Sequence, residues 1–335
     1  MKRLSVVALV IGVLLLASPG YAQQFTYAYV VVPCSPLPPT SCPNGSARQT
    51  TASGINPAGD IVGNFIDGVG VQHGFLLSNG TFKIIDVPGE LFGTTGSLPT
   101  SANGINPAGD IVGNFRVPMN ALVPQDSPAY CPGPGSAACT KGFRYSRGRF
   151  DVVLFPGHPG AIPQRISPDG DIYGCLHDFD TGMSMFGAVW SRKGNLSLGA
   201  GGGHLADPSI EVPMSMSNGA TPDGHTIVGL WDAMPGQRHG FVVVNGIFHS
   251  YDARPGISTL TAIWDINPHR EFVGTYVDNT GRHAFLQRPD GSAPIIVDPP
   301  GATSATAFGI NPAGVIVGVY TAGGATRGFV AVPVN

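Results

Sequence analysis

The chain has few charges, few cysteines and almost no glutamate for its length. Charged residues make up 12% of its 335 residues, there are 5 cysteines, and the only glutamates are Glu90, Glu211 and Glu271. No basic tract is present, so nucleic acid and anionic membranes are poor candidate partners. With so few charges, stability must come from burial and strand pairing rather than from networks of ion pairs.

Common catalytic motifs are also missing. The sequence contains no Gly-x-Ser-x-Gly elbow, no His-Glu-x-x-His motif and no phosphate-binding loop. A carboxylate pair for glycoside hydrolysis could still be assembled from aspartates that are distant in sequence. We therefore predict no catalytic residues, no metal and no cofactor, with a polysaccharide-active enzyme left open as an alternative.

The longest apolar run lies at the N-terminus and is too short to span a membrane as a helix. Lys2 and Arg3 precede an apolar core at Leu4–Ala17, and Gly20-Tyr21-Ala22 is a small-x-small cleavage site. This order predicts a signal peptide over residues 1–22 and an exported protein, periplasmic or extracellular, over residues 23–335. Cleavage removes two positive charges and makes the formal charge of −3 more negative.

What the sequence does contain is a repeat. A turn followed by a short strand with a glycine occurs six times, first as Ile55-Asn56-Pro57-Ala58-Gly59-Asp60-Ile61-Val62-Gly63. The other copies are Ile105–Gly113, Ile166–Gly174, Ala220–Gly229, Ile266–Gly274 and Ile310–Gly318, and the turn prolines are Pro57, Pro107, Pro168, Pro222, Pro268 and Pro312. These prolines lie 44 to 61 residues apart, a period typical of repeat architectures.

Each repeat divides into four predicted strands. In the first repeat these are Gln49–Ile55, Asp60–Phe65, His73–Ser78 and Thr81–Val87, with tight turns at Asn56–Gly59 and Asn79–Gly80. Four strands per repeat are typical of a blade of a β-propeller, whereas a β-helix repeats over shorter distances. The predicted fold is therefore all-β, a six-bladed β-propeller forming a single domain over residues 23–335.

The two ends of the chain are complementary. The sixth repeat stops after its third strand, Arg327–Val334, while Phe25–Val32 reads as a fourth strand with no blade before it. Placing the N-terminal strand on the outside of the last blade would remove two exposed edges. We expect this pairing to close the ring.

The loops divide into two sets. Connections between the second and third strands and between consecutive blades lie on one face, and they include the long segments Cys34–Arg48, Arg116–Lys141 and Gly199–Met214. We name this the long-loop face and predict that it is the working surface, because function concentrates on variable loops held by a scaffold. The alternative is that some of these loops only cap the channel. The opposite face, with short repeated turns, we name the short-turn face.

Four of the cysteines form two local pairs. Cys34 with Cys42, and Cys131 with Cys139, each enclose seven residues on the long-loop face. In an exported protein this spacing predicts two disulfides and does not match structural zinc ligands. Cys175 lies in a predicted strand and is expected to be a buried, inert thiol.

A basic residue, a small residue and phenylalanine recur at the start of the third strand. The copies are His73-Gly74-Phe75, Lys141-Gly142-Phe143, His239-Gly240-Phe241, His283-Ala284-Phe285 and Arg327-Gly328-Phe329. Together with the Asn-Pro-x-Gly turn, this pattern resembles the bacterial extracellular HAF repeat family, over essentially the whole mature chain. The resemblance implies export and repetition, and no catalytic residues.

The recurring basic residues are the candidate binding residues. The set is His73, Lys141, His177, Asp178, His239, His283 and Arg327. Asp67, Asp178, Asp232 and Asp278 follow the second strands, so each acid could instead pair with the basic residue of the neighbouring third strand. His177-Asp178 is the densest candidate for metal ligation, although no second ligand group accompanies it. The phenylalanines are expected to fill the core.

The functional prediction is an exported, non-catalytic binding or scaffold module. Its expected partner is a glycan or an extracellular protein, bound on the long-loop face. The alternative is a polysaccharide-active hydrolase or lyase with its site at the channel mouth. In a thermal-shift screen with glycans and divalent cations, a shift with one glycan class would favour carbohydrate recognition and name the substrate for a turnover assay, whereas a flat screen would favour a protein partner.

Overall fold

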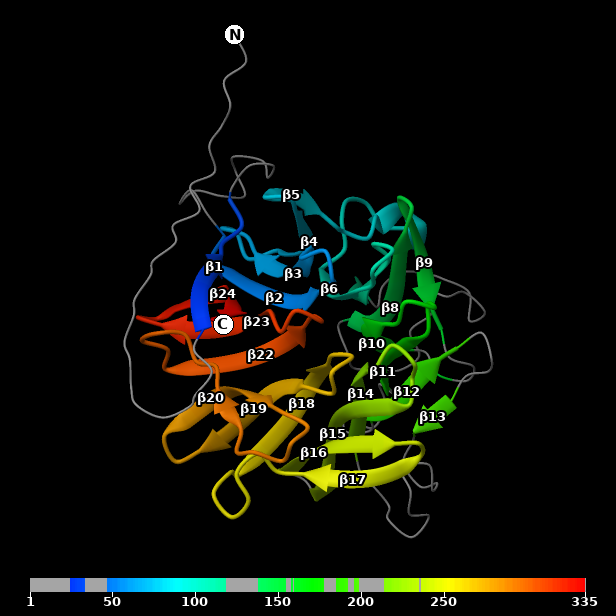
Figure 1. The fold of residues 1–335 in the computed structure, drawn as a ribbon. Coiled ribbons are helices and arrows are strands. Elements are labelled where there is room, and N and C mark those ends of the chain that lie inside the picture. Colours follow the sequence, from blue (N-terminus) through cyan, green and yellow to red (C-terminus); the bar gives the residue numbers. More distant parts are fainter. Residues whose placement is uncertain are drawn as a thin grey trace.

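The computed structural model describes residues 25–33, 47–118, 138–154, 158, 160–177, 185–191, 196–198, 214–234 and 236–334. Apart from the 3-10 helix η2 (Gly89–Phe92), the regular elements in this part of the chain are β-strands. They form units of antiparallel strands that follow one another around a common centre (Figure 1). The chain is therefore all-β, as predicted.

Five of the units are consecutive in sequence, and each contains four strands. The first consists of β2 (Gln49–Ile55), β3 (Ile61–Ile66), β4 (Gln72–Ser78) and β5 (Thr81–Ile84). The second consists of β6 (Thr100–Ile105), β7 (Ile111–Pro118), β8 (Ala138–Ser146) and β9 (Arg149–Val153). The third consists of β10 (Ala161–Ile166), β11 (Ile172–His177), β12 (Met185–Trp190) and β13 (Leu196–Leu198).

The fourth and fifth units have the same antiparallel order. The fourth consists of β14 (Met214–Ala220), β15 (Thr226–Met234), β16 (Gln237–Val244) and β17 (Ile247–Tyr251). The fifth consists of β18 (Leu260–Ile266), β19 (Phe272–Asp278), β20 (Gly281–Gln287) and β21 (Ile295–Ile296). The connection between β20 and β21 is longer than the tight turn between β16 and β17.

The sixth unit combines both ends of the chain. It consists of β22 (Ser304–Ile310), β23 (Ile316–Ala322), β24 (Ala325–Pro333) and the N-terminal strand β1 (Phe25–Val30). β1 runs antiparallel to β24, with Phe25 opposite Pro333 and Val30 opposite Gly328. The N-terminal strand thus pairs with the strand that the sequence suggested.

The repeated turns form for a local reason. In the first copy the amide of Gly59 donates to the carbonyl of Asn56 at 3.0 Å, and Gly59 adopts a φ of 87°. Glycine enters this left-handed region without the steric cost that a side chain would add. The side-chain oxygen of Asn56 also accepts from the amide of Asp60 at 2.9 Å. The turn is therefore specified by residues within a few positions of one another.

The glycine of the second strand and the phenylalanine of the third strand form a matched pair. Gly63 lies opposite Phe75, and a Cβ at Gly63 would lie 2.8 Å from the phenyl ring and 1.9 Å from the carbonyl oxygen of Thr51. The equivalent phenylalanines are at most 1% exposed: Phe143, Phe241, Phe285 and Phe329. In the third unit Gly174 lies opposite Ala188 instead. The expectation that these phenylalanines fill the core is confirmed.

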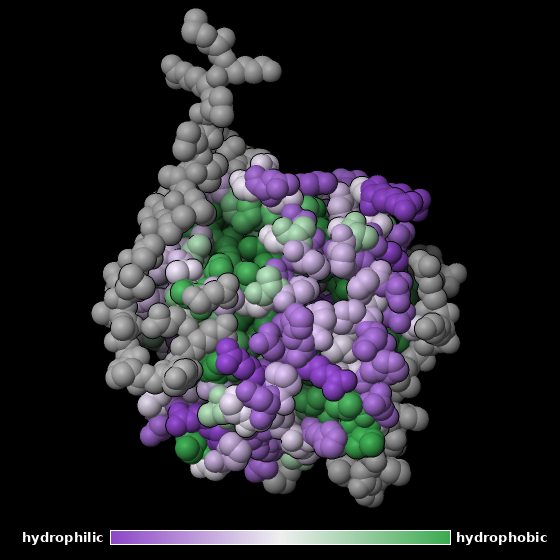
Figure 2. Space-filling view, viewed as in Figure 1, coloured by the Kyte–Doolittle hydropathy of each residue, from purple (hydrophilic) through white to green (hydrophobic). Residues whose placement is uncertain are grey.

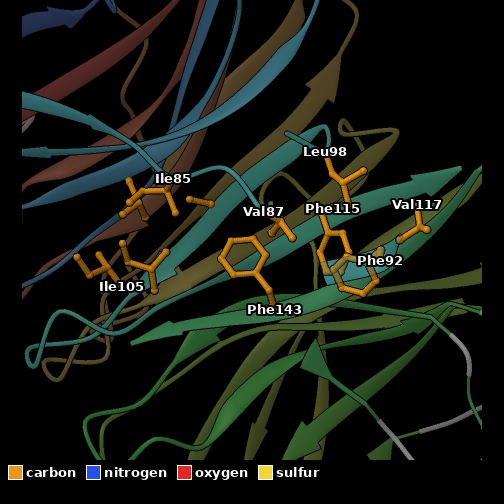
Figure 3. Close-up of a cluster of buried hydrophobic side chains, with 11 residues drawn as sticks. Ile85, Val87, Phe92, Leu98, Ile105, Phe115, Val117 and Phe143 are labelled. Carbon is orange, nitrogen blue, oxygen red and sulfur yellow. The ribbon is translucent and has the colours of Figure 1, made fainter. Parts of the chain in front are cut away.

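The hydrophobic core lies between neighbouring units. Figure 3 shows one cluster in which Ile85 and Val87, from the end of the first unit, lie near Phe143 and Phe115 of the second. A corresponding cluster joins the last and first units, where Val30 and Val317 pack with Phe65. Burying side chains of this size stabilises by about 1.5–3 kcal/mol each, so the interfaces between units carry much of the stability.

The first strands of the units surround the centre. Each contacts the first strand of the next unit, in the order β2, β6, β10, β14, β18 and β22, and β22 in turn contacts β2. In the described part of the chain, no helix is long and apolar enough to cross a membrane.

Candidate binding site

Three of the predicted histidines bind carboxylates of their own unit. Their Nδ1 atoms lie 2.6 to 2.8 Å from aspartates that follow the fourth strand: His73 with Asp86, His239 with Asp252 and His283 with Asp298. These histidines therefore hold the end of the fourth strand against the start of the third, and each contact stays within one unit. Sequence reasoning missed these aspartates, although an aspartate shortly before Pro-Gly at the end of the fourth strand recurs in the sequence.

The predicted acids of the second strand make longer contacts with two of the same histidines. Asp67 lies 3.6 Å from Nε2 of His73, and Asp278 lies 3.4 Å from Nε2 of His283. Burial alone would lower the pKa of His73, but Asp86 and Asp67 together raise it. The pairing suggested across the second and third strands is thus present in these two units, as the weaker of two contacts.

The fourth unit pairs differently. Asp232 binds Arg238, with Nε of the arginine 2.9 Å from the carboxylate, whereas His239 binds Asp252. The arginine one position earlier in the strand takes the place that the sequence assigned to the histidine.

The remaining predicted residues do not gather at one place. Lys141 is 2% exposed, and burial lowers its pKa to about 8. Arg327 is exposed and lies opposite Tyr320 on the neighbouring strand. His177 ends β11, while Asp178 lies outside the described residues. The basic residues start the third strands of separate units, so each occupies its own part of the ring.

Only part of the cysteine prediction falls on described residues. Cys139 is buried and disulfide-bonded, whereas Cys34, Cys42 and Cys131 lie outside the described residues. The specific pairs stay predictions. Cys175 is free and fully buried, and burial raises its pKa to about 12. The expectation of a buried free thiol is therefore confirmed.

The centre surrounded by the first strands holds an arginine that sequence reasoning missed. Nη1 of Arg165 donates to the carbonyl oxygens of Asn103 at 2.8 Å and Gln164 at 2.7 Å. Nη2 donates to the carbonyl oxygens of Ser53, at 3.0 Å, and Phe308. One side chain on β10 thereby connects strands of the first, second, third and sixth units.

Asp265 of β18 completes this arrangement, which we name the axial pair. Its Oδ2 lies 3.1 Å from Nε of Arg165 and accepts from the amide of Ile310 at 3.1 Å, and its Oδ1 accepts from the amide of Ile266. Arg165 and Asp265 are 9% and 8% exposed. The pair forms the floor of a hollow of about 100 Å³ ringed by the turn prolines, which is smaller than typical ligand sites of about 300–1,000 Å³.

A larger cavity lies at the side of the ring, between the fourth and fifth units. It measures about 840 Å³, and we name it the side groove. Its walls come from the end of β17 and the segment after it, and from β19 and the β20–β21 connection: Val242, His249–Ile257 except Gly256, Phe272, Tyr276, Gln287–Pro289, Gly291–Pro294 and Ile296. Its volume lies within the usual range for ligand sites.

The groove combines fixed aromatic side chains with an exposed rim. The hydroxyl of Tyr251 donates to Oε1 of Gln287 at 2.7 Å, and its ring packs edge-on against Phe272 at a centroid distance of 4.9 Å. Ile257 and Ile296 on the rim are 51% and 52% exposed. On the face seen in Figure 2, hydrophilic residues cover much of the molecule, and hydrophobic residues are visible over β2 and β3, beside β1, and over β15–β17.

Arg254 places a positive charge beside the groove. Its Nη1 lies 3.1 Å from Oδ2 of Asp278, and its guanidinium lies over the ring of Tyr276 at 6.0 Å. The hydroxyl of Thr280 donates to Asp278 and contributes most to lowering the pKa of this carboxyl group to about 2. The groove therefore offers an apolar wall next to a positioned cation.

Comparison with known proteins bears on the fold. No family model matches the chain, and no curated protein matches it. A protein of unknown function from Dyadobacter fermentans DSM 18053 has a similar structure, with 13% identity, a TM-score of 0.52, and coverage of 85% of this chain and 94% of that one.

Two further solved structures have lower TM-scores. The gluconolactonase XC5397 from Xanthomonas campestris has 12% identity, a TM-score of 0.49 and coverage of 93% and 91% of the two chains. The β-propeller domain of the Trilobed protease from Pyrococcus furiosus has 7% identity, a TM-score of 0.46 and coverage of 85% and 95%. At such identities a likeness concerns the fold alone.

Proposed function

We propose that the protein is an exported six-bladed β-propeller of the HAF-repeat type, closed by β1 on the last blade. Support for closure comes from the pairing of β1 with β24 and from the cluster joining Val30 and Val317 to Phe65. The amide nitrogen of the Asn311 side chain also donates to the carbonyl of Asn56 at 3.4 Å, from the last repeated turn to the first. Export rests on the charge and hydropathy pattern of residues 1–22.

We further propose that this propeller is a non-catalytic binding module whose ligand occupies the side groove. The observation that carries the proposal is the contrast between a groove of about 840 Å³ and an axial hollow of about 100 Å³. The groove is lined by connections that run towards both faces, from the segment after β17 to the β20–β21 connection. A site of this volume, lined from both directions, suits an extended ligand such as a glycan chain or a segment of an extracellular protein.

A polysaccharide-active enzyme with its site at the channel mouth has less support. Among the described residues that line the axial hollow, Asp265 carries the carboxylate, and it is held by Arg165 and two backbone amides. Glycoside hydrolysis requires a second carboxyl group within about 5–9.5 Å of the first. No such partner lines the hollow in the described part of the chain. Because the turn prolines place this hollow on the short-turn face, a site at the channel mouth on the long-loop face remains the alternative.

The test is a binding screen with a matched pair of variants. Soluble glycans and peptides are screened by thermal shift, where a ligand at 100 times its dissociation constant stabilises by about 2.7 kcal/mol. Ile257→Trp places a bulky ring in the groove, whereas Ile247→Trp changes an isoleucine that is 61% exposed and does not line it. We expect ligand binding to be lost in the first variant and retained in the second.

Two outcomes would contradict the proposal. Equal binding by both variants would place the ligand outside the groove. Turnover of a bound polysaccharide by the wild-type chain, measured as new reducing ends, would favour the enzyme instead.

A further inference from the structure

Every first strand carries one extra residue at the same position. The pairing register with the second strand shifts at this residue in all six units: Ser53, Asn103, Gln164, Asn218, Trp264 and Phe308. Such a bulge leaves one residue unpaired and turns its backbone groups away from the ladder. Four of these residues direct their carbonyl oxygens at the guanidinium of Arg165.

The residue after each bulge faces the neighbouring unit. It is glycine in four units, Gly54, Gly104, Gly219 and Gly309, and it is Arg165 and Asp265 in the third and fifth. A Cβ at Gly104 would lie 2.5 Å from the carbonyl oxygen of Gln164, and one at Gly54 would lie 2.8 Å from that of Asn103. The glycines thus bring the backbones together and leave the axial space to one cation and one anion.

The donors and acceptors at the axis match a planar cation. Four N–H groups of Arg165 meet four carbonyl oxygens, and Asp265 faces the remaining nitrogen at 3.1 Å. An ammonium group presents its donors from a single point, whereas a guanidinium presents five in a fixed plane. A guanidinium can therefore donate to all four carbonyls while it faces Asp265, whereas an ammonium has only three donors.

We propose that the bulge carbonyls and Asp265 form a guanidinium-binding site at the axis, which the side chain of Arg165 fills from within the chain. The first, second, third, fifth and sixth units each contribute a group that contacts this guanidinium. Occupancy of the site then holds the first and last units together, independently of β1. This inference is separate from the side groove and does not depend on ligand binding there.

Chemical rescue tests the site in the full-length chain. Arg165→Ala removes the guanidinium and leaves its cavity, and methylguanidinium is then supplied in solution at concentrations well below denaturing ones. We expect Arg165→Ala to lower the midpoint of thermal unfolding and methylguanidinium to raise it again in a saturable way. Methylammonium and sodium at equal ionic strength should not raise the unfolding midpoint of Arg165→Ala. Neither methylguanidinium nor methylammonium should change the unfolding midpoint of the wild type.

A matched arginine serves as the control. Arg254 also pairs with an aspartate, Asp278, but lies at the side of the ring. Arg254→Ala should show no saturable response to methylguanidinium. An unchanged midpoint for Arg165→Ala, or equal rescue by methylammonium, or equal rescue of Arg254→Ala, would overturn the proposal.

A lysine variant tests the proposal if Arg165→Ala does not fold, with or without methylguanidinium. Arg165→Lys keeps the charge beside Asp265 but has three donors instead of five, so it cannot donate to all four carbonyls. The proposal predicts a clearly lower unfolding midpoint for Arg165→Lys than for Arg254→Lys. A midpoint equal to that of the wild type would show that a charge is sufficient and would overturn the guanidinium site.

Discussion

The axis and the side groove are built from the same repeats, yet one is filled and the other is open. At the axis the first strands approach so closely that Gly104 has no room for a Cβ, and Arg165 satisfies carbonyls from several units. At the side, the short β21 and the long connection before it leave about 840 Å³ against Tyr251. The difference shows that the polar groups around Arg165 bind one another, whereas a cavity opens where one unit departs from the repeat.

The largest expected effect comes from breaking the axial pair on its acidic side. Asp265→Ala leaves the buried guanidinium of Arg165 without its counter-charge, which costs about 3–5 kcal/mol of unfolding free energy. Denaturant unfolding measures the loss. The matched rim variant Ile257→Ala should change the same quantity by less than about 0.5 kcal/mol, because the residue is exposed. Similar effects for the two variants would remove the distinction between axis and groove.

The close approach at the axis is tested by adding a methyl group. Gly104→Ala sets a Cβ 2.5 Å from the carbonyl oxygen of Gln164, so the backbones must separate at a cost of about 1–3 kcal/mol. The contact between Arg165 and Asp265 should loosen as well. Because the amide of Ile310 donates to Asp265, this loosening should appear as faster hydrogen exchange of that amide. If neither the exchange rate of this amide nor the free energy of unfolding changes, the units are not packed this tightly.

The wall of the groove is tested by removing one hydroxyl group. Tyr251→Phe removes the hydrogen bond to Gln287, which is 6% exposed, and should lower the unfolding free energy by about 1 kcal/mol. Ligands found in the screen should bind more weakly, because the wall loses its fixed position. Tyr145→Phe, which removes a hydroxyl bonded to the exposed Lys83, is the control and should leave ligand binding unchanged.

The smallest effect concerns pH. Because Asp86 and Asp67 raise the pKa of His73 above its ordinary value of 6.5, the protonated histidine stabilises the folded state. This contribution is fully present below about pH 6.5 and is lost as the pH rises through the higher folded-state value. His73→Gln should therefore flatten the fall in thermal midpoint between about pH 6 and about pH 8. An identical pH profile for the two proteins would contradict the ion pair.

Much of the fold could be predicted because its signals are local. The Asn-Pro-x-Gly turn needs only the backbone preferences of Pro57 and Gly59 and a side-chain contact from Asn56 to Asp60. The strands on either side follow from the positions of the repeated turns. The role of the glycine in the second strand, such as Gly63, became clear only from the structure, because it depends on Phe75 in the neighbouring strand.

The candidate sites were less accessible to sequence reasoning because they depend on contacts between units. Asp86 lies thirteen positions after His73, so the pair emerges only when the fourth strand folds back. Arg165 is bound by carbonyls of Ser53 and Phe308, which are more than a hundred positions away in opposite directions. One signal was present, however: the position three before each turn proline is glycine except at Arg165 and Asp265.

The most direct test of the distinction between axis and groove is a crystal structure of the protein soaked with small aromatic and saccharide fragments. The account predicts fragments in the side groove, against Tyr251 and between Ile257 and Ile296, and an axial pair that retains its contacts. Fragments gathered in the axial hollow, displacing Arg165 from the carbonyl oxygens while the side groove stays empty, would contradict it.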